Sequence, residues 1–571
     1  MSHLIAISIG PVQEFIAAAR RTRDLWFGSY VLSELSRAAA DCVRGLGGEL
    51  IFPASTGTSG IANVILAELS EHDPADVARQ AKEAVRRKWK EFCDDALNAV
   101  SACIRKEIWD SQADDVIEFY AAWVVRSDNY ARDRARLMRL LAGRKNCREF
   151  APAEGLAGVP KSSLDGRRES VLKDLRLERV PEKQRRLLRL REGEQLDVVG
   201  VVKRAASGNK PYPSVSRVAA DPWVRGNQDK PAFRELLTAC ESFTGDVLHR
   251  LDPKEFPQYR SFPFEGSVVY RSRFHELQQE TGINDSQSAE TEAILEKLVA
   301  ALEKLPEPEP YVAVLAADGD RMGNVIASLD SPNAHRRFSE SLAAFADQAR
   351  RIVAEHYGFL IYAGGDDVLA VVPVDQCLAC AAALRDSFLA CLEGYAGASL
   401  SVGIAVAHFL ENLEDLLEYG RAAEKAAKMP DRNGLAIHLY KRSGAPIGIR
   451  ARWDEQPRAR LERLVQLFVM DVLPSRVPYE LRLTADLYEN WPEAIAASAL
   501  RADVRRILER KQSRQGPGAV HANLAELSAA LQNATDLRQL AETMLVARHL
   551  ARAWKQAASV SPKAVYQEVH E

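Results

Sequence analysis

The sequence predicts an α+β protein with two sheet domains of the β-α-β-β-α-β type and helical domains beside them. Three observations support this fold class. The chain opens with an apolar strand pattern at residues 4–10, followed by apolar residues at helical spacing. Strand and helix patterns alternate from residue 311 to residue 440. Residues 221–305 and the chain beyond residue 445 carry mainly helical patterns.

Length and composition predict a multidomain, water-soluble protein. A chain of 571 residues is too long for one core, so three to four domains are expected. Its 76 Lys and Arg nearly balance 79 Asp and Glu, which argues against a protein that grips nucleic acid through overall charge. The start lacks the positive region of a signal peptide, and no apolar run approaches the ~20 residues that cross a bilayer. We therefore expect a cytoplasmic protein.

Residues 1–220 are predicted to form the first sheet domain. After the opening strand and helix, a long helical stretch is expected from about residue 74 to 141. A basic, Leu-bearing helix broken at Pro181 is expected at residues 173–191. Residues 196–203, Leu-Asp-Val-Val-Gly-Val-Val-Lys, have the pattern of a strand that returns to the sheet of this domain.

The remaining chain divides into three further predicted domains. Residues 221–305 form a helical domain, which ends in the stiff connector Pro-Glu-Pro-Glu-Pro at residues 306–310. Residues 306–445 form the second sheet domain, and residues 446–571 form a C-terminal helical domain. The strands of the second sheet domain are expected at residues 311–317, 359–363, 368–372, 399–406 and 435–440, with helices between them. This order is a ferredoxin-like core with one appended helix and strand.

The turn Gly364-Gly365-Asp366-Asp367 joins the second and third of these strands. Two adjacent carboxylates repel, and Asn-Gly or Asp-Gly would close a hairpin without that cost. The pair is favoured where divalent cations offset the charge, and Mg²⁺ or Mn²⁺ prefers such oxygen ligands. Asp366 and Asp367 are therefore candidate catalytic and metal-binding residues.

Asp318 is a third candidate, because it ends the strand that lies beside the hairpin in a ferredoxin-like sheet. The following glycines, Gly319 and Gly323, let the backbone approach phosphates closely, as do Gly364 and Gly365 in the turn. Three carboxylates with a glycine-rich loop describe a two-metal site for nucleotidyl transfer. An acidic turn beside an unrelated acidic loop is the alternative.

Two neighbouring positions are expected to support the site. Asp320 is assigned a supporting role in nucleotide binding, with its side chain directed away from Asp318. Lys428 stands at the basic end of the predicted helix at residues 414–428, from which an amine would reach a triphosphate. A solvated lysine at a helix end is equally compatible with the sequence.

The eight cysteines give no metal or disulfide framework. Cys377 and Cys380 form a lone Cys-x-x-Cys, whereas a structural zinc site needs four ligands. Both fall on the apolar pattern of a helix, so we expect buried core residues, with neither zinc nor a disulfide.

Several segments resemble the large Cas10-type (Cmr-type) subunit of type III-B CRISPR complexes. In the second sheet domain these are residues 317–323, Ala-Asp-Gly-Asp-Arg-Met-Gly, and residues 362–370 around the Gly-Gly-Asp-Asp turn. In the first, the similar segments are residues 9–16, 22–30 and 160–170 and the strand pattern ending at Arg204. The resemblance covers residues 1 to about 445.

The resemblance implies two Palm domains of the polymerase and cyclase type. It implies ATP as the substrate, converted to cyclic oligoadenylate when a complex with a guide RNA and other subunits binds target RNA. Metal ligation falls on Asp318, Asp366 and Asp367. Similarity to GGDEF cyclases, through Ser401-Val-Gly-Ile-Ala405 and the pattern from Lys428 to Asn433, adds the backbone of Gly319. The first Palm domain is expected to hold a second nucleotide with Gly10, Ser29 and Tyr30, so a homodimer is not required.

Two departures from the family pattern affect other activities. Many relatives begin with a histidine-aspartate nuclease domain, whereas here the sheet pattern starts at residue 4 and the His72-Asp73 pair has the setting of a surface turn. We therefore expect no DNase activity. Relatives often carry a zinc-binding cysteine cluster where Cys147 stands alone, so we expect no zinc there.

Other readings stay open at this point. The same site would make another ATP-derived signal, a cyclic dinucleotide or ATP joined to a small molecule, or the chain would be an inert scaffold. The basic stretches at residues 183–191 and 501–514 would contact RNA or partner subunits, or be solvated helix faces.

Overall fold

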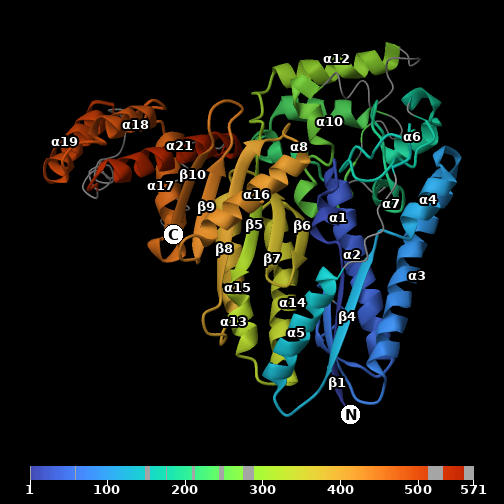
Figure 1. The fold of residues 1–571 in the computed structure, drawn as a ribbon. Coiled ribbons are helices and arrows are strands. Elements are labelled where there is room, and N and C mark those ends of the chain that lie inside the picture. The colour runs from blue at the N-terminus through green and yellow to red at the C-terminus, as the bar shows by residue number, and fades with distance from the viewer. Residues whose placement is uncertain are drawn as a thin grey trace.

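The computed structural model contains two β-sheets that stand side by side, with helices above them and a group of C-terminal helices projecting to one side (Figure 1). The structure describes residues 2–57, 60–147, 155–174, 176–208, 212–243, 248, 250–273, 289–511 and 531–558. Parts of the predicted helical domains, at residues 244–247, 249, 274–288, 512–530 and 559–571, lie outside the described residues. None of the described helices is long and apolar enough to cross a membrane.

The first sheet has four antiparallel strands in the order β2-β3-β1-β4. The strands are β1 (His3–Gly10), β2 (Glu49–Phe52), β3 (Val64–Leu69) and β4 (Glu118–Val125). Between β1 and β2 the chain forms α1 (Gln13–Ala17) and α2 (Thr22–Gly45), and between β3 and β4 it forms α3 (Pro74–Val100) and α4 (Lys106–Ala113). This is the expected β-α-β-β-α-β order.

Each face of the first sheet is covered by helices. Ile5, Ile7 and Ile65 belong to the same buried apolar cluster as residues of α2 and α3. On the opposite face, Leu4 and Val124 share a cluster with residues of α5 (Tyr130–Asn146). Side chains of β1 are thus buried on both faces of the sheet, which is why this strand is apolar along most of its length.

The fourth strand of this sheet lies where the sequence predicted helix. Residues 74–141 hold β4 between α4 and α5. Residues 196–203, expected to be the returning strand, instead belong mainly to α7 (Val198–Ala205). A fully buried apolar run has no alternation that separates strand from helix. Here the Asp197 carboxylate accepts a hydrogen bond from the Gly200 amide at 2.9 Å, and this cap starts the helix.

The basic stretch at residues 173–191 is helical only in part. It contains the 3₁₀ turn η2 (Leu177–Arg179) and, after Pro181, the short helix α6 (Glu182–Leu188). Proline disfavours helix in the residue before it, so the two pieces do not join.

The second sheet has six strands in the order β10-β9-β8-β5-β7-β6. They are β5 (Tyr311–Asp320), β6 (Phe359–Gly364), β7 (Asp367–Val372), β8 (Ser399–His408), β9 (Gly434–Leu439) and β10 (Ile447–Arg452). The first four in chain order form the predicted ferredoxin-like core, and the predicted further strand, β9, runs parallel to β8. The edge strand β10 lies within residues 446–571, which were expected to be helical, because it pairs with β9 and extends the sheet past the predicted boundary. One face shares a buried cluster with α14 (Pro332–Glu355) and α15 (Cys377–Cys391), and the other with α16 (Leu413–Lys428).

The helical regions lie above and beside the second sheet (Figure 1). Between the sheets in sequence are α8 (Val215–Ala219), α9 (Asp221–Asn227), α10 (Pro231–Glu241) and α12 (Ala289–Glu303), and α13 (Met322–Ala327) follows β5. The C-terminal helices are α17 (Pro457–Val469), α18 (Val477–Tyr488), α19 (Glu493–Lys511) and α21 (Ala534–Ala557). The remaining 3₁₀ turns are η1 (Ser101–Cys103), η4 (Pro257–Tyr259), η5 (Gly266–Val269), η6 (Arg271–Arg273) and η7 (Trp453–Glu455). Cys377 and Cys380 are buried in α15, as predicted.

Polar contacts join the two sheet domains along α14. The Arg336 guanidinium donates to the Leu50 carbonyl at 2.8 Å, and the Ser339 hydroxyl accepts from the Ala54 amide at 2.9 Å. The helix α2 also packs beside β6, the edge strand that carries the acidic turn. The first domain therefore forms a wall next to the candidate site.

Candidate active site at the junction of the two sheet domains

The acidic turn is a two-residue hairpin. Gly364 pairs with Asp367 at the ends of β6 and β7, so Gly365 and Asp366 form the turn. Gly365 has a φ of +67°, which a side chain would strain, and glycine at the first central position is what a type II′ hairpin requires. The predicted strand-turn-strand is confirmed.

Three carboxylates converge at this hairpin. Ala317 in β5 pairs with Val368 in β7, so the next residues, Asp318 and Asp367, lie opposite one another. Burial, followed by the negative charge of Asp318, raises the pKa of Asp366 to about 6. Burial and a hydrogen bond shared with Asp318 also raise the pKa of Asp367 well above its usual range. The structure therefore brings together the three residues that the sequence predicted. Their mutual repulsion and burial disfavour the ionised forms of Asp366 and Asp367.

Gly319 is needed for the hairpin to approach β5. A Cβ atom on Gly319 would lie 2.8 Å from both Cβ and Oδ2 of Asp366. The absence of a side chain at this position thus sets how closely the turn lies over the strand.

We expect Gly319→Ala to displace Asp366 and to lower the rate of synthesis by about 10-fold or more, since small misplacements of reacting groups are costly. Overpacking should also cost about 1–3 kcal/mol of stability. Gly143→Ala is the matched control, because no atom lies within 4 Å of the added Cβ there. Turnover and thermal unfolding of both variants check the prediction, and a normal rate in Gly319→Ala would contradict it.

Asp320 shares the face of β5 with Asp318 and does not point away from it, contrary to the expectation. Side chains two residues apart lie on the same face of a strand, and β5 continues through this residue. Asp320 is 1% exposed and accepts hydrogen bonds from the hydroxyls of Ser399 and Ser401, each at 2.8 Å, and from the backbone amide of Asn433 at 3.0 Å. These bonds make Asp320 an anchor for the loop after α16.

Lys428 lies at the carboxylate cluster. It is the last residue of α16, and its Nζ forms ion pairs with Asp318 and, at 2.6 Å, with Glu424. Although partial burial acts in the opposite direction, the hydrogen bonds to Asp318 and Glu424 raise the pKa of Lys428. A positive charge therefore stands beside the acidic turn at neutral pH.

The other predicted glycines differ in their surroundings. Gly323 is exposed in the first turn of α13. At Gly364 a Cβ atom would collide with the ring of Tyr362, whose hydroxyl lies 2.1 Å from that position, so the tyrosine side chain extends along β6 toward the turn.

The donor atoms suit divalent cations. Three carboxylates supply hard oxygens, and burial together with neighbouring carboxylates raises the pKa values of Asp366 and Asp367, which a bound cation would counteract. Within the described ranges, no three His, Cys, Asp or Glu side chains are already arranged around a common point for a metal ion. Asp318 is held instead by Lys428 and Asp367. The residues fit Mg²⁺ or Mn²⁺ in their chemistry, and their side chains would reorient to bind it.

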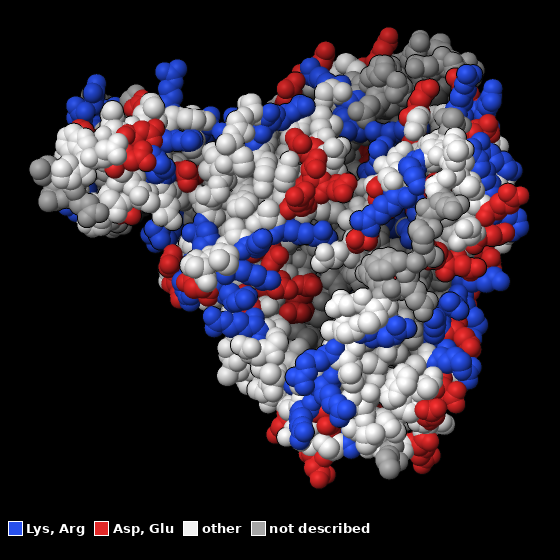
Figure 2. Space-filling model, in the orientation of Figure 1, with Lys and Arg blue, Asp and Glu red and all other residues white. Residues whose placement is uncertain are grey.

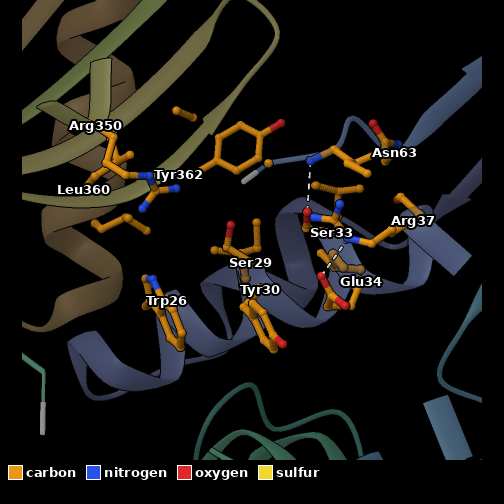
Figure 3. Close-up of a pocket in the computed structure, with 18 residues that line it drawn as sticks. Trp26, Ser29, Tyr30, Ser33, Glu34, Arg37, Asn63, Arg350, Leu360 and Tyr362 are labelled. Carbon is orange, nitrogen blue, oxygen red and sulfur yellow. Dashed lines mark hydrogen bonds and ion pairs between the residues drawn. The ribbon is translucent and has the colours of Figure 1, made fainter. Parts of the chain in front are cut away.

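A cavity of about 400 Å³ lies between α2 of the first domain and β6 of the second. Figure 3 shows Ser29 on α2 directed toward Leu360 and Tyr362 on β6, with Arg350 of α14 beside β6 and the rings of Trp26 and Tyr30 lower on α2. The Tyr362 hydroxyl lies close to Gly364 at the start of the acidic turn, and burial, followed by the charges of Asp367 and Asp366, raises the pKa of Tyr362. The cavity is therefore a neighbour of the carboxylates.

Of the three residues predicted to hold a second nucleotide, Ser29 and Tyr30 line this cavity, whereas Gly10 does not and lies beside Glu118 at the end of β1. Sequence reasoning missed the cavity-lining residues Trp26, Arg350, Leu360 and Tyr362. One signal was present, because Trp26 and Tyr30 lie one helical turn apart, and their rings stack at 5.4 Å.

The other residues discussed from the sequence lie elsewhere. His72 and Asp73 are exposed, and the Asp73 carboxylate caps α3 by accepting from the Ala75 amide at 3.2 Å. The basic stretch at residues 501–514 lies on α19 as far as residue 511, and residues 512–514 are outside the described residues. Neither segment lines the cavity.

Two family models match the chain. The model described as Cas10/Cmr2, second palm domain, matches residues 311–436, and the model described as CRISPR-associated protein Cmr2, N-terminal, matches residues 4–94. The CRISPR system Cmr subunit Cmr2 of Pyrococcus furiosus is 35% identical over an alignment of 182 residues that covers 27% of this chain. The match spans 21% of that relative, about a fifth of its length.

Two solved structures share the fold. A chain of the type III-B Cmr-beta assembly in its apo state has a TM-score of 0.65 over 90% of this chain and 78% of that chain. In the assembly bound to cognate target RNA the TM-score is 0.61 over 90% and 79%. Each is 12% identical in sequence, so these matches concern the fold. They agree with the predicted α+β architecture.

Proposed function

Because the chain is a Cmr-type Cas10 protein, we propose that it is a nucleotidyltransferase that joins ATP into cyclic oligoadenylate. One observation carries this proposal. Asp318, Asp366 and Asp367 converge beside Lys428, next to a cavity whose opposite wall belongs to the other Palm domain. A carboxylate cluster next to a cavity of nucleotide size suits phosphoryl chemistry.

In the proposed reaction the 3′-oxygen of one ATP attacks the α-phosphorus of another. The new bond is O3′–Pα, the bond from Pα to the bridging oxygen breaks, pyrophosphate leaves, and the hydroxyl proton passes to solvent. Asp318, Asp366 and Asp367 would hold two Mg²⁺ or Mn²⁺ ions, which when bound supply charge neutralisation at the phosphates and acidify the hydroxyl. The Lys428 amine orients the triphosphate electrostatically once it exchanges Asp318 for phosphate oxygens.

The two walls of the cavity have different roles in this proposal. The second Palm domain supplies the carboxylates, and the backbone of Gly319 lies next to Asp366. The first Palm domain supplies Ser29 and the stacked rings of Trp26 and Tyr30, which suit a nucleoside. Because one chain provides both walls, a homodimer is not needed.

Two other readings lead to different results. The same site would make a cyclic dinucleotide or ATP joined to a small molecule, and an inert scaffold would make nothing. The complex is incubated with ATP, Mg²⁺ and target RNA, and mass spectrometry of the products distinguishes the proposed function from the two alternatives. Rings of three or more AMP units support the proposal, a two-membered ring or another ATP adduct supports the alternative product, and the absence of product would overturn both enzyme readings.

We also propose that the chain works with other type III-B subunits, a guide RNA and a target RNA. The chain with the shared fold in the RNA-bound Cmr-beta assembly supports this assignment. Target RNA would act by favouring one arrangement of the two Palm domains, and only through its differential affinity for that arrangement.

We expect turnover to be low for the chain alone and for the complex with guide RNA only, and to rise at least about 10-fold with target RNA. The measurement is ATP consumption in these three states at equal protein concentration. Equal rates in all three would refute gating by RNA, and a rate that rises with the square of chain concentration would indicate a dimeric enzyme.

A further inference from the structure

One face of α5 concentrates positive charge. Tyr130, Leu137 and Leu141 of this helix pack on the first sheet. The opposite face is exposed and carries five basic residues, Arg132, Arg136, Arg139, Arg144 and Lys145. Figure 2 shows Lys and Arg side chains gathered where α5 lies in Figure 1. We refer to these five residues as the α5 basic face.

Carboxylates do not balance the α5 basic face. The single acid of the helix, Asp133, is buried and accepts hydrogen bonds from the amide and hydroxyl of Ser127, at 2.6 and 2.9 Å. Among the residues that the structure describes, none of the five basic side chains forms an ion pair, and Arg144 donates only to the Cys147 carbonyl. The chain as a whole has a formal charge of −3. The imbalance is therefore local to this helix.

The helix α3, which covers the other face of the same sheet, shows how charges are paired on a helix surface of this protein. Its Arg79 pairs with Asp76 at 3.1 Å and with Glu83 at 3.4 Å, and its Lys88 pairs with Glu91 at 3.0 Å. Such pairs at three- and four-residue spacing neutralise a helix surface. The α5 basic face lacks them, so its charge is available to an external anion.

We propose that the α5 basic face binds the phosphate backbone of single-stranded RNA. Arg132, Arg136 and Arg139 stand at i, i+4 and i+7 and form one stripe about 10 Å long, and Arg144 and Lys145 add charge at the C-terminal end of the helix. Arginine presents a planar fork of donors that matches phosphate oxygens. A row of arginines without carboxylates binds a polyanion at several successive phosphates. That the polyanion is RNA rests on the proposed function, whereas the site for a polyanion does not.

The position of α5 links this site to the junction of the Palm domains. The Tyr130 hydroxyl forms a 2.7 Å hydrogen bond with Nδ1 of His335 in α14, and the Arg134 guanidinium donates to the Leu329 carbonyl at 3.3 Å. Burial, followed by the charge of Arg134, lowers the pKa of His335 to about 4, so this contact is uncharged at neutral pH. RNA on the outer face of α5 would thus touch the helix that ties the first sheet to the second domain.

The test measures binding of a ~30-nucleotide single-stranded RNA to the full chain, without ATP, from about 50 to 200 mM salt. The test variant carries Arg132→Gln, Arg136→Gln, Arg139→Gln and Arg144→Gln. The control variant removes four charges that are paired with an acid on their own helix, through Arg44→Gln, Arg79→Gln, Lys88→Gln and Lys106→Gln. Thermal unfolding shows that both variants fold.

Each lost phosphate contact should reduce the slope of log K against log salt by about 0.7, so the test variant should lose about 3 units of slope and the control variant none. Equal slopes in the test variant and the unmodified chain would overturn the proposal, as would no RNA binding by the unmodified chain. Tighter binding of poly-glutamate than of RNA would also overturn it, because α5 would then dock an acidic protein. Since the assay needs neither ATP nor the carboxylates, its failure is distinct from a failure of the proposed synthesis.

Discussion

Replacing the acidic turn by amides, Asp366→Asn with Asp367→Asn, should lower product formation by at least about 100-fold while the chain folds and assembles normally. Charge is needed to bind cations, whereas the type II′ turn depends on Gly365. Burial and the neighbouring carboxylates raise the pKa of both aspartates, so their ionised forms are disfavoured in the folded chain. Removing the charges should therefore leave the unfolding temperature unchanged or raise it.

The matched control for this double variant is Asp94→Asn with Asp95→Asn. These residues are also adjacent aspartates, and both are exposed on α3. The control should retain full synthesis. If the Asp366 and Asp367 double variant still made product at saturating Mg²⁺, the carboxylates at the hairpin would not be the metal ligands.

Filling the cavity should stop synthesis by a different route. In Ser29→Tyr the larger side chain extends from α2 toward Leu360 and Tyr362 and occupies the space assigned to the second nucleotide (Figure 3). We expect synthesis to fall by at least about 10-fold, because the acceptor can no longer be positioned. Binding of Mn²⁺, followed by electron paramagnetic resonance, should be retained, since Asp318, Asp366 and Asp367 are unchanged.

The control for cavity filling is Ser101→Tyr, which adds the same side chain at an exposed position in η1. It should preserve both synthesis and Mn²⁺ binding. Normal synthesis in Ser29→Tyr would show that the acceptor nucleotide binds elsewhere, and loss of Mn²⁺ binding would mean that the substitution disturbs the carboxylates themselves.

The second Palm domain, apart from its edge strand β10, could be predicted from the sequence in detail, and the first could not. In the second, the Gly-Gly-Asp-Asp turn and the spacing of buried strands give both topology and register, which places Asp318 opposite Asp367. In the first, the fully buried residues of α7 lack a period, and β4 follows two helices without a glycine or proline that would mark it. Local pattern is uninformative where burial is complete or where tertiary pairing decides the outcome.

The site residues that lie within one domain could be predicted, whereas those that depend on contact between the domains could not. Asp318, Asp366, Asp367 and Lys428 follow from motifs within one domain, and the structure brings all four together. The cavity wall depends on how α2 sits against β6, so Arg350 and Tyr362 have no signal in sequence alone. Asp320 differs from these residues. Its place in the motif predicted a role in nucleotide binding, whereas its carboxylate accepts hydrogen bonds from the hydroxyls of Ser399 and Ser401 and from the backbone amide of Asn433.

The most direct test of the central claim is the ratio of pyrophosphate released to AMP incorporated by the purified complex with target RNA. Attack of a 3′-oxygen on an α-phosphate predicts one pyrophosphate for each AMP unit in the product, and neither species from the Asp366→Asn, Asp367→Asn variant assayed beside it. Release of inorganic phosphate or ADP in place of pyrophosphate, or the same output from the variant, would contradict nucleotidyl transfer at this hairpin.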